Sequence, residues 1–159
     1  MTFAALAAVL ASWPALPAAA TPGWTMRTMP SRTGIELPGL ACPAIDTCYA
    51  VGWSASGPMA ERWDGTSWSI QSTPGPTGLQ LLAVSCSAVS ACTAVGTDSS
   101  LGTPVAERWD GSSWSVQSLP YWAGQLGSVS CASDTGCTAV GYQVTGRITT
   151  AVAASWSGS

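Results

Sequence analysis

Apolar and polar residues alternate along two nearly identical stretches of the chain, from Ala60 to Pro74 and from Ala106 to Pro120. In each stretch the alternation surrounds two tryptophans and is interrupted by an Asp-Gly pair, which tolerates the positive φ that tight turns need. The pattern predicts two short strands joined by a hairpin in both places. A unit that recurs so faithfully is typical of a structural scaffold.

Cysteines set the length of the repeat. Three pairs share an internal gap of six positions, and the pairs begin at residues 42, 86 and 131, which are 44 and 45 positions apart. Each second cysteine opens a CxAVG run, and a leucine (Leu37, Leu81 or Leu126) stands five positions before each first cysteine. A unit therefore has a strand a that ends at the first cysteine, a strand b, and the hairpin strands c and d. Four short strands in about 45 residues match one propeller blade.

The units are expected at residues 37–74, 81–120 and 126–158 of a β-repeat domain that covers 21–159. The third unit lacks its own d strand, whereas the segment from Trp24 to Pro30 aligns with the d strand of the first unit, Trp68 to Pro74. Pairing these two ends would close a ring and remove exposed strand edges. We therefore expect residues 24–30 to form an N-terminal d strand.

The expected fold is all-β, with three four-stranded antiparallel blade-like repeats of the β-propeller type. Propellers usually have four to eight blades, so two chains could form a homodimer that completes a six-bladed ring. A single chain with three units could instead close on itself, and the β-trefoil and the β-prism are threefold alternatives of about this repeat length.

Residues 1–20 form an apolar run that contains two prolines and ends in three alanines, a pattern that signal peptidase accepts. The uninterrupted apolar part is about 12 residues, against the roughly 20 that a membrane anchor needs. We therefore expect a signal peptide and a secreted mature protein without a membrane span. The run departs from the usual signal-peptide pattern in one respect, because no basic residue precedes Phe3.

Charge is sparse along the chain. Charged residues make up 8% of the 159, the formal net charge is −3, and the chain contains no lysine, histidine or asparagine. This composition excludes the basic surface that nucleic-acid binding needs, and a polybasic membrane patch as well. Without histidine there is no catalytic triad, and without lysine there is no Walker loop. We expect no enzymatic activity and no cofactor.

The cysteines could be metal ligands or disulfides. Zinc sites favour two to four residues between cysteines and often include histidine, whereas these pairs have five intervening residues and the chain has no histidine. We therefore expect no metal and three local disulfides, each worth roughly 2 kcal/mol for so short a loop. The predicted bridges are Cys42–Cys48, Cys86–Cys92 and Cys131–Cys137.

The hairpin aromatics have two interpretations. Trp63, Trp109 and Trp156 close strand c, while Trp24, Trp68 and Trp114 open strand d, so each hairpin would carry a cross-strand aromatic pair. The first interpretation is core packing. The second is that some rings are exposed as stacking platforms for sugars. Specificity peculiar to this chain would have to come from residues outside the repeat, such as Trp53, Tyr121, Trp122 and Arg147.

Two resemblances follow from these motifs. The VSC, CxAVG and ERWDG-x-SWSVQ motifs between Val84 and Pro120, with their sister copies, resemble a tandem repeat of predicted secreted proteins from high-GC Gram-positive bacteria. Those proteins look like β-propellers and have no assigned activity. This resemblance covers nearly all of residues 24–158.

The hairpin also resembles that of fucose-binding propeller lectins, in which a glutamate and two tryptophans contact the sugar. The resemblance implies a ligand site at Glu61, Trp63 and Trp68, and a second at Glu107, Trp109 and Trp114. Two departures matter here: CxAVG has no arginine on strand b, and the third unit has Ala154 in place of the glutamate. The D-G-x-S-W turn is similar to the Asp-box of sialidase-type propellers, although one residue shorter.

The functional hypothesis is a secreted, non-catalytic binding or scaffold module at the cell surface. A carbohydrate-binding lectin, with a glycan or a cell-wall polysaccharide as partner, is the first alternative. A glycan-directed hydrolase remnant is the second. The lectin needs exposed hairpin aromatics, whereas the hydrolase needs a single carboxylate pair that faces one pocket.

Overall fold

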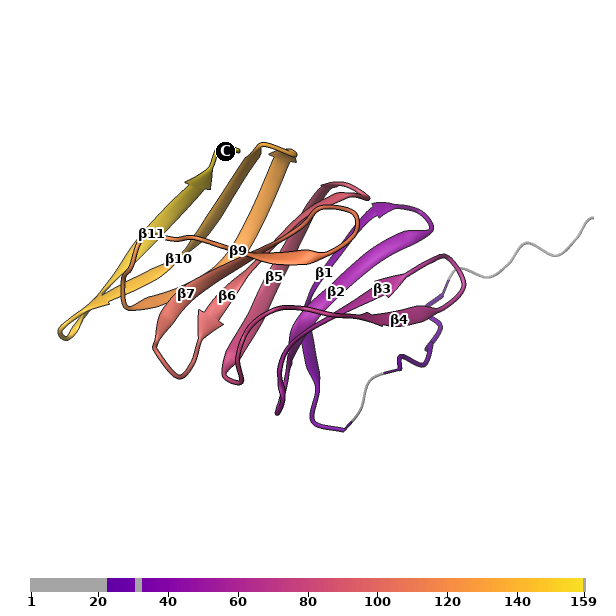
Figure 1. Ribbon diagram of the computed structural model, residues 1–159, viewed down its shortest axis with the longest axis horizontal. Coiled ribbons are helices and arrows are strands. Elements are labelled where there is room, and N and C mark those ends of the chain that lie inside the picture. Colours follow the sequence, from indigo (N-terminus) through magenta and orange to yellow (C-terminus); the bar gives the residue numbers. More distant parts are fainter. Residues whose placement is uncertain (1–22, 31–32, 159) are drawn as a thin grey trace, which may run out of the picture.

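The computed structural model of the chain describes residues 23–30 and 33–158, and the predicted signal peptide lies outside them. Every regular element in this part of the chain is a β-strand (Figure 1). The strands are β1 Glu36–Ala44, β2 Thr47–Ser54, β3 Gly57–Trp63, β4 Trp68–Gln71, β5 Leu79–Ala88, β6 Ala91–Asp98, β7 Thr103–Trp109, β8 Trp114–Gln117, β9 Gly124–Ser133, β10 Gly136–Thr145 and β11 Ile148–Trp156.

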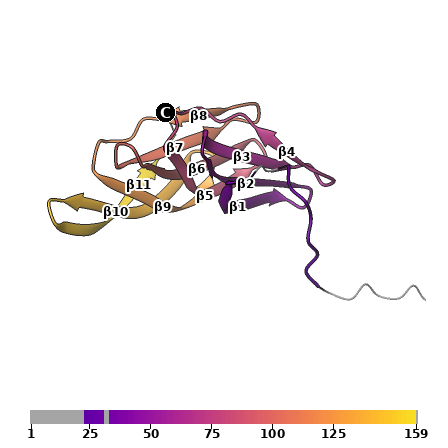
Figure 2. The same ribbon diagram turned by 90° about the horizontal axis from the view of Figure 1, so that it is seen from below.

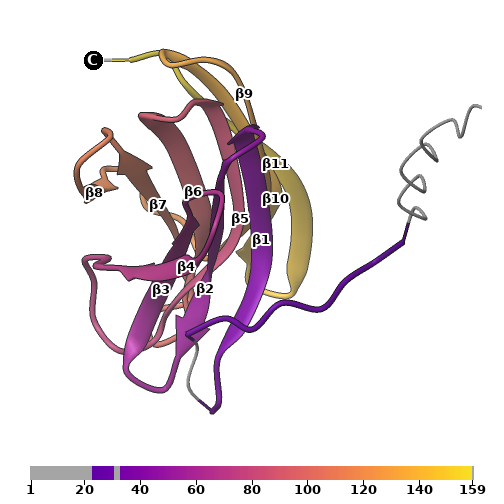
Figure 3. The same ribbon diagram turned by 90° about the vertical axis from the view of Figure 1, so that its right-hand side faces the viewer.

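These strands form three antiparallel sheets, one for each predicted unit. Unit 1 has the order β1-β2-β3-β4, unit 2 has β5-β6-β7-β8, and unit 3 has β9-β10-β11. Strands that follow one another in the chain are neighbours in the sheet, because short loops join antiparallel strands. The first strand of unit 2, β5, contacts both β1 and β9, and unit 2 lies between the other two (Figures 1 and 3).

Both predicted hairpins are present in units 1 and 2. Trp63 pairs with Trp68 across β3 and β4, and Trp109 pairs with Trp114 across β7 and β8. Gly65 has a φ of 94° and Gly111 one of 98°, as the Asp-Gly turn requires. The prediction that these tryptophans close strand c and open strand d is confirmed.

All three predicted disulfides are present, Cys42–Cys48, Cys86–Cys92 and Cys131–Cys137. Each joins the first two strands of its unit near the turn between them. Those first strands continue two residues past the first cysteine, and the turn follows. Disulfides form and persist in oxidising environments, so the bridges indicate that the protein folds in such a compartment.

The recurrent glycine of CxAVG has a structural cause. A Cβ atom on Gly52, Gly96 or Gly141 would overlap a backbone oxygen of the preceding strand. In unit 2 this contact is made with Gln80, beside a register shift between Leu81 and Ala83. The irregularity brings two backbones so close that only glycine fits.

The core of the protein lies between the sheets. Tyr49 and Val51 of β2 pack with Leu81, Cys92 and Trp109 of unit 2 in one cluster. A second cluster forms between units 2 and 3, with Val95, Ala106, Leu126 and Ala139 as its buried members. Neighbouring residues of β6 therefore belong to different clusters, because successive side chains point to opposite faces of a sheet. Unit 2 is covered on both faces.

The structure differs from the sequence-based expectation at the two ends of the repeat array. Residues 24–30 are not a strand in the single chain, and Trp24 is 104% exposed, so the predicted N-terminal d strand stays a prediction. Unit 3 has three strands, and β11 has a strand neighbour on one side only among the described residues. The described sheets do not close into a ring. The physical reason is that units 1 and 3 lie on opposite sides of unit 2 (Figure 1).

Candidate functional site

The tryptophan pair of unit 2 is a packing element. Trp109 and Trp114 are each 5% exposed, and their ring centroids lie 5.7 Å apart. Tyr49 of unit 1 contacts both rings, with centroid distances of 5.7 Å to Trp109 and 6.3 Å to Trp114. Edge and tilted arrangements of this kind are favourable between aromatic rings. The first of the two interpretations, core packing, therefore holds for this hairpin.

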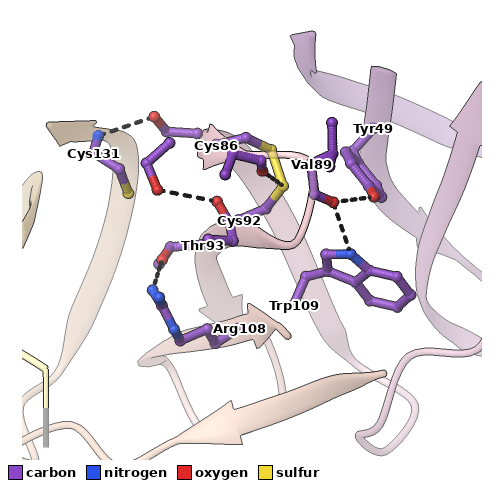
Figure 4. Close-up of a disulfide and its surroundings, with 12 residues drawn as sticks. Tyr49, Cys86, Val89, Cys92, Thr93, Arg108, Trp109 and Cys131 are labelled. Atoms are coloured by element: carbon purple, nitrogen blue, oxygen red, sulfur yellow. Dashed lines mark hydrogen bonds between the residues drawn. A yellow bond between two sulfur atoms is a disulfide. The ribbon is translucent and has the colours of Figure 1, made fainter. Parts of the chain in front are cut away.

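Hydrogen bonds to one turn carbonyl strengthen the same contact. The hydroxyl of Tyr49 donates to the backbone oxygen of Val89 at 2.7 Å, and the indole Nε1 of Trp109 donates to the same oxygen at 3.3 Å (Figure 4). Val89 lies in the turn between β5 and β6, just after Cys86. The Cys86–Cys92 disulfide of unit 2 thus fixes the turn whose carbonyl accepts the hydrogen bond from Tyr49 of unit 1.

Glu107 lies inside the protein, next to the tryptophan pair. It is fully buried between its cross-strand neighbours Ala94 and Val116, and neither carboxylate oxygen has a hydrogen-bond partner in the described part of the chain. Burial raises the pKa of Glu107 from 4.5 to about 8, because the charged form is disfavoured away from water. The side chain is therefore mostly protonated and neutral at pH 7.

The hairpin of unit 1 is more open. Trp63 and Trp68 are half-buried with centroids 5.8 Å apart, and the guanidinium of Arg27 lies 5.4 Å from the ring centre of Trp63. Glu61 is fully buried, as Glu107 is, but it has an interaction partner. The structure thus brings each predicted Glu and Trp set together, yet it withdraws both carboxylates from solvent. Direct sugar contact by the carboxylates is therefore disfavoured, and sugar binding at these residues stays a prediction.

The aspartates of the hairpins serve the turns. Oδ1 of Asp110 accepts hydrogen bonds from the backbone N–H groups of Ser112 and Ser113, both at 2.8 Å, and Asp64 makes equivalent bonds in unit 1. The Ser112 hydroxyl, which donates to the same oxygen at 2.7 Å, and these two backbone N–H groups lower the pKa of Asp110 to about 2. The same kind of bonding holds the pKa of Asp64 well below its usual range. Both carboxylates accept turn hydrogen bonds that stabilise the charged form, so a catalytic role is not needed to explain them.

A cavity of about 390 Å³ lies between units 2 and 3. Its wall is mostly apolar and includes Val95, Leu119, Trp122, Leu126, Ala154 and Trp156. The cavity follows from three changes in the repeat. Thr93 stands where unit 1 has Tyr49, Ala154 stands where unit 2 has Glu107, and among the described residues unit 3 shows no counterpart of Trp114.

Arg108 supplies the polar side of this cavity. Its guanidinium lies 3.9 Å from the ring centre of Trp156, a cation–π contact, and it donates to the Thr93 hydroxyl at 3.2 Å. It also donates to the backbone oxygen of Asp134, which is the position in unit 3 that matches Val89 in unit 2. Arg108 therefore repeats, between units 2 and 3, the contact that Tyr49 makes between units 1 and 2.

The residues outside the repeat lie in different places. Trp122 lines the cavity, and its indole nitrogen has no hydrogen-bond partner within the described ranges. Tyr121 is 86% exposed, Trp53 is in β2, and Arg147 is exposed in the turn between β10 and β11. Only Trp122 of these four is part of the candidate site.

Sequence reasoning missed Tyr49 and Arg108. The signal for Tyr49 was a departure from the repeat, because the other two CxAVG runs carry threonine at that position. Arg108 gave no such signal, since Arg62 occupies the same position in unit 1. Its role follows from the neighbouring unit, which brings Trp156 against it.

In residues 23–30 and 33–158 no group of histidine, cysteine, aspartate or glutamate side chains is placed to hold a metal ion. The same residues contain no helix long and apolar enough to cross a bilayer.

Comparison of the chain with known proteins finds no match among protein-family models, curated proteins or solved structures. The resemblances drawn from the motifs therefore remain interpretations of the sequence.

Proposed function

We propose that the protein is a secreted, non-catalytic binding or scaffold module of the cell surface, with units of the β-propeller type. One observation carries the proposal: the repeated glutamates are buried, the tryptophan pair of unit 2 packs against Tyr49, and the disulfides clamp the first two strands of each unit. Groups committed to packing are not available for chemistry. The order of the strands in each sheet, with β5 in contact with both β1 and β9, supports propeller-type blades.

The test of this function uses the mature chain, residues 21–159, produced with its disulfides formed. We expect it to sediment with intact Gram-positive cells or isolated cell-wall polysaccharide and to release no soluble sugar. Protein that stays in the supernatant with every wall preparation contradicts the binding role. Release of reducing sugar contradicts the non-catalytic role and favours a hydrolase.

Carbohydrate binding is the second candidate, and the half-buried pair Trp63 and Trp68 favours it. Exposed ring faces can stack on the apolar side of a sugar. We expect Trp68→Ala to abolish retention on a polysaccharide column if this pair is the site, while Tyr121→Ala, a change of an exposed aromatic, leaves it unchanged. Equal retention of the Trp68 variant and the unaltered protein excludes this pair as the site.

A further inference from the structure

The outer edge of β11 has no strand partner among the described residues. In unit 2 the equivalent strand β7 pairs with β8, and Trp114 of β8 packs beside Trp109. In unit 3, Trp156 occupies the position of Trp109, β11 has no neighbour on this edge within the described residues, and the cavity of about 390 Å³ lies beside the ring. In unit 2 a tryptophan on a paired strand, Trp114, occupies the equivalent place.

The segment of residues 24–30 carries such a tryptophan. Trp24 is 104% exposed and Met26 is 99% exposed, so neither side chain packs against the chain that carries it. The segment aligns with residues 68–74, which begin with β4, so that Trp24 corresponds to Trp68 and Pro30 to Pro74. Leu37 follows Pro30 by seven positions, Leu81 follows Pro74 by seven, and Leu126 follows Pro120 by six. Residues 24–30 therefore have the composition and the spacing of a strand that precedes a unit.

The segment and β11 lie at opposite ends of the molecule (Figures 1 and 2). Arg27 lies over Trp63 of unit 1, in the same way that Arg108 of unit 2 lies over Trp156 of unit 3. The segment is thus on the face of unit 1 that a preceding unit would cover. A chain cannot offer this segment to its own β11 while units 1 and 3 lie on opposite sides of unit 2.

We propose that β11 accepts residues 24–30 of a second copy of the chain as its fourth strand, with Trp24 of that copy in the cavity beside Trp156. The register follows from β3 and β4, where Trp63 pairs with Trp68 and Arg62 with Ser69. It places Trp24 opposite Trp156 and Thr25 opposite Ser155. This assembly goes beyond the proposed function and does not depend on any ligand.

Pairing of residues 24–30 with β11 would also bring unit 1 of the second copy against unit 3 of the first. Unit 1 of the second copy follows its own residues 24–30 and so meets the outer face of unit 3, where Val140 is 49% exposed beside an apolar hollow that includes Ala151 and Ala153. Val140 and Ala153 correspond to Val95 and Ala106, which are buried between units 2 and 3. The new contact therefore continues an interface that the chain already makes. Reciprocal donation gives two identical junctions and a closed ring of six units.

Cross-linking in the proposed register is the sharpest test. Thr25→Cys combined with Ser155→Cys should give a covalent dimer on a non-reducing gel, because the two residues face each other across the new strand pair. Thr25→Cys combined with Thr150→Cys is the matched control, since Thr150 lies on β11 outside this register. A dimer with the first pair and not with the second supports the proposal. Equal dimer from both pairs, or none from either, overturns it.

Native mass gives a second readout that does not depend on added cysteines. The protein should have the mass of two chains, and Trp24→Ala should shift it to the mass of one chain. Tyr121→Ala should leave two chains, because this exposed aromatic has no place in the junction. A monomeric unaltered protein, or a Trp24 variant that stays dimeric, overturns the proposal. If the unaltered protein has the mass of two chains but does not bind the cell wall, the proposed function is contradicted and the assembly still stands.

Discussion

At the scale of single residues, burial decides what the repeated carboxylates do. Glu107 and Asp110 are three positions apart, yet their pKa values move in opposite directions. Glu107 is away from water and its pKa rises to about 8, while the exposed Asp110 accepts turn hydrogen bonds and its pKa falls to about 2. One carboxyl group is neutral at pH 7 and the other is charged. A glutamate and a tryptophan side by side in a sequence therefore do not establish a sugar site.

The buried carboxyl group predicts how stability depends on pH. Between pH 4.5 and about 8 the folded state keeps the proton of Glu107 and the unfolded state loses it, so the free energy of unfolding should fall as the pH rises. Each unit of difference in pKa corresponds to about 1.4 kcal/mol. Glu107→Gln should remove most of this fall and raise the melting temperature at pH 8.

Thermal unfolding followed by circular dichroism between pH 4 and pH 9 measures the effect. The control is Glu36→Gln, which changes an exposed glutamate at the start of β1 and should leave the pH profile as it is. An unchanged profile in the Glu107 variant would mean that the carboxylate finds a partner or water and is ionised in the folded protein.

At the scale of the strands, close backbone contact explains the most regular feature of the sequence. A Cβ atom added to Gly96 would overlap the backbone oxygen of Gln80, whereas one added to Gly127 on β9 would lie 3.9 Å from the side chain of Gln125. Gly96→Ala should lower the free energy of unfolding by roughly 1–3 kcal/mol, because β5 must move to admit the methyl group. Gly127→Ala should change it by less than about 0.5 kcal/mol.

Urea unfolding of the two variants measures both values. Because each substitution adds the same methyl group to a glycine in a strand, helix or strand propensity cannot account for a difference between them. Equal stability of the two proteins would show that the irregular pairing of β5 and β6 relaxes without cost.

The strands also show what sequence reasoning can reach in this protein. The hairpins and disulfides depend on residues close together in the chain, so the spacing of Trp63 and Trp68, or of Cys86 and Cys92, was enough to predict them. Contacts between units depend on which sheet face meets which neighbour. Alternation assigns residues to two faces, but unit 2 is buried on both, so the burial of Glu107 and the role of Tyr49 could not be predicted. Residues 24–30 have the composition of a strand but form none in the single chain, because a strand also needs the edge of a neighbouring strand to pair with.

At the scale of the whole molecule, stability depends on how the units are coupled. Tyr49 links units 1 and 2 through its ring contacts with Trp109 and Trp114 and through its hydrogen bond to Val89. Arg108 links units 2 and 3 through Trp156 and the turn at Asp134. In repeat proteins, each unit is stabilised mainly by contact with its neighbours, so cooperative unfolding depends on these interfaces.

Substitutions at Tyr49 test that coupling. Tyr49→Phe keeps the ring and leaves Trp109 as a donor to Val89, so the loss should be about 1 kcal/mol. Tyr49→Ala removes a fully buried ring and should lower the free energy of unfolding by about 3–5 kcal/mol. The substitution removes the ring with which unit 1 packs against unit 2, so unit 1 should be the unit that is destabilised. We expect scanning calorimetry to show one transition for the unaltered protein and for Tyr49→Phe, and two for Tyr49→Ala. Tyr121→Ala, which removes an exposed ring, should behave as the unaltered protein does. A single transition in Tyr49→Ala at a lower temperature would mean that the backbone contacts of β1 with β5 couple the units without the aromatic cluster.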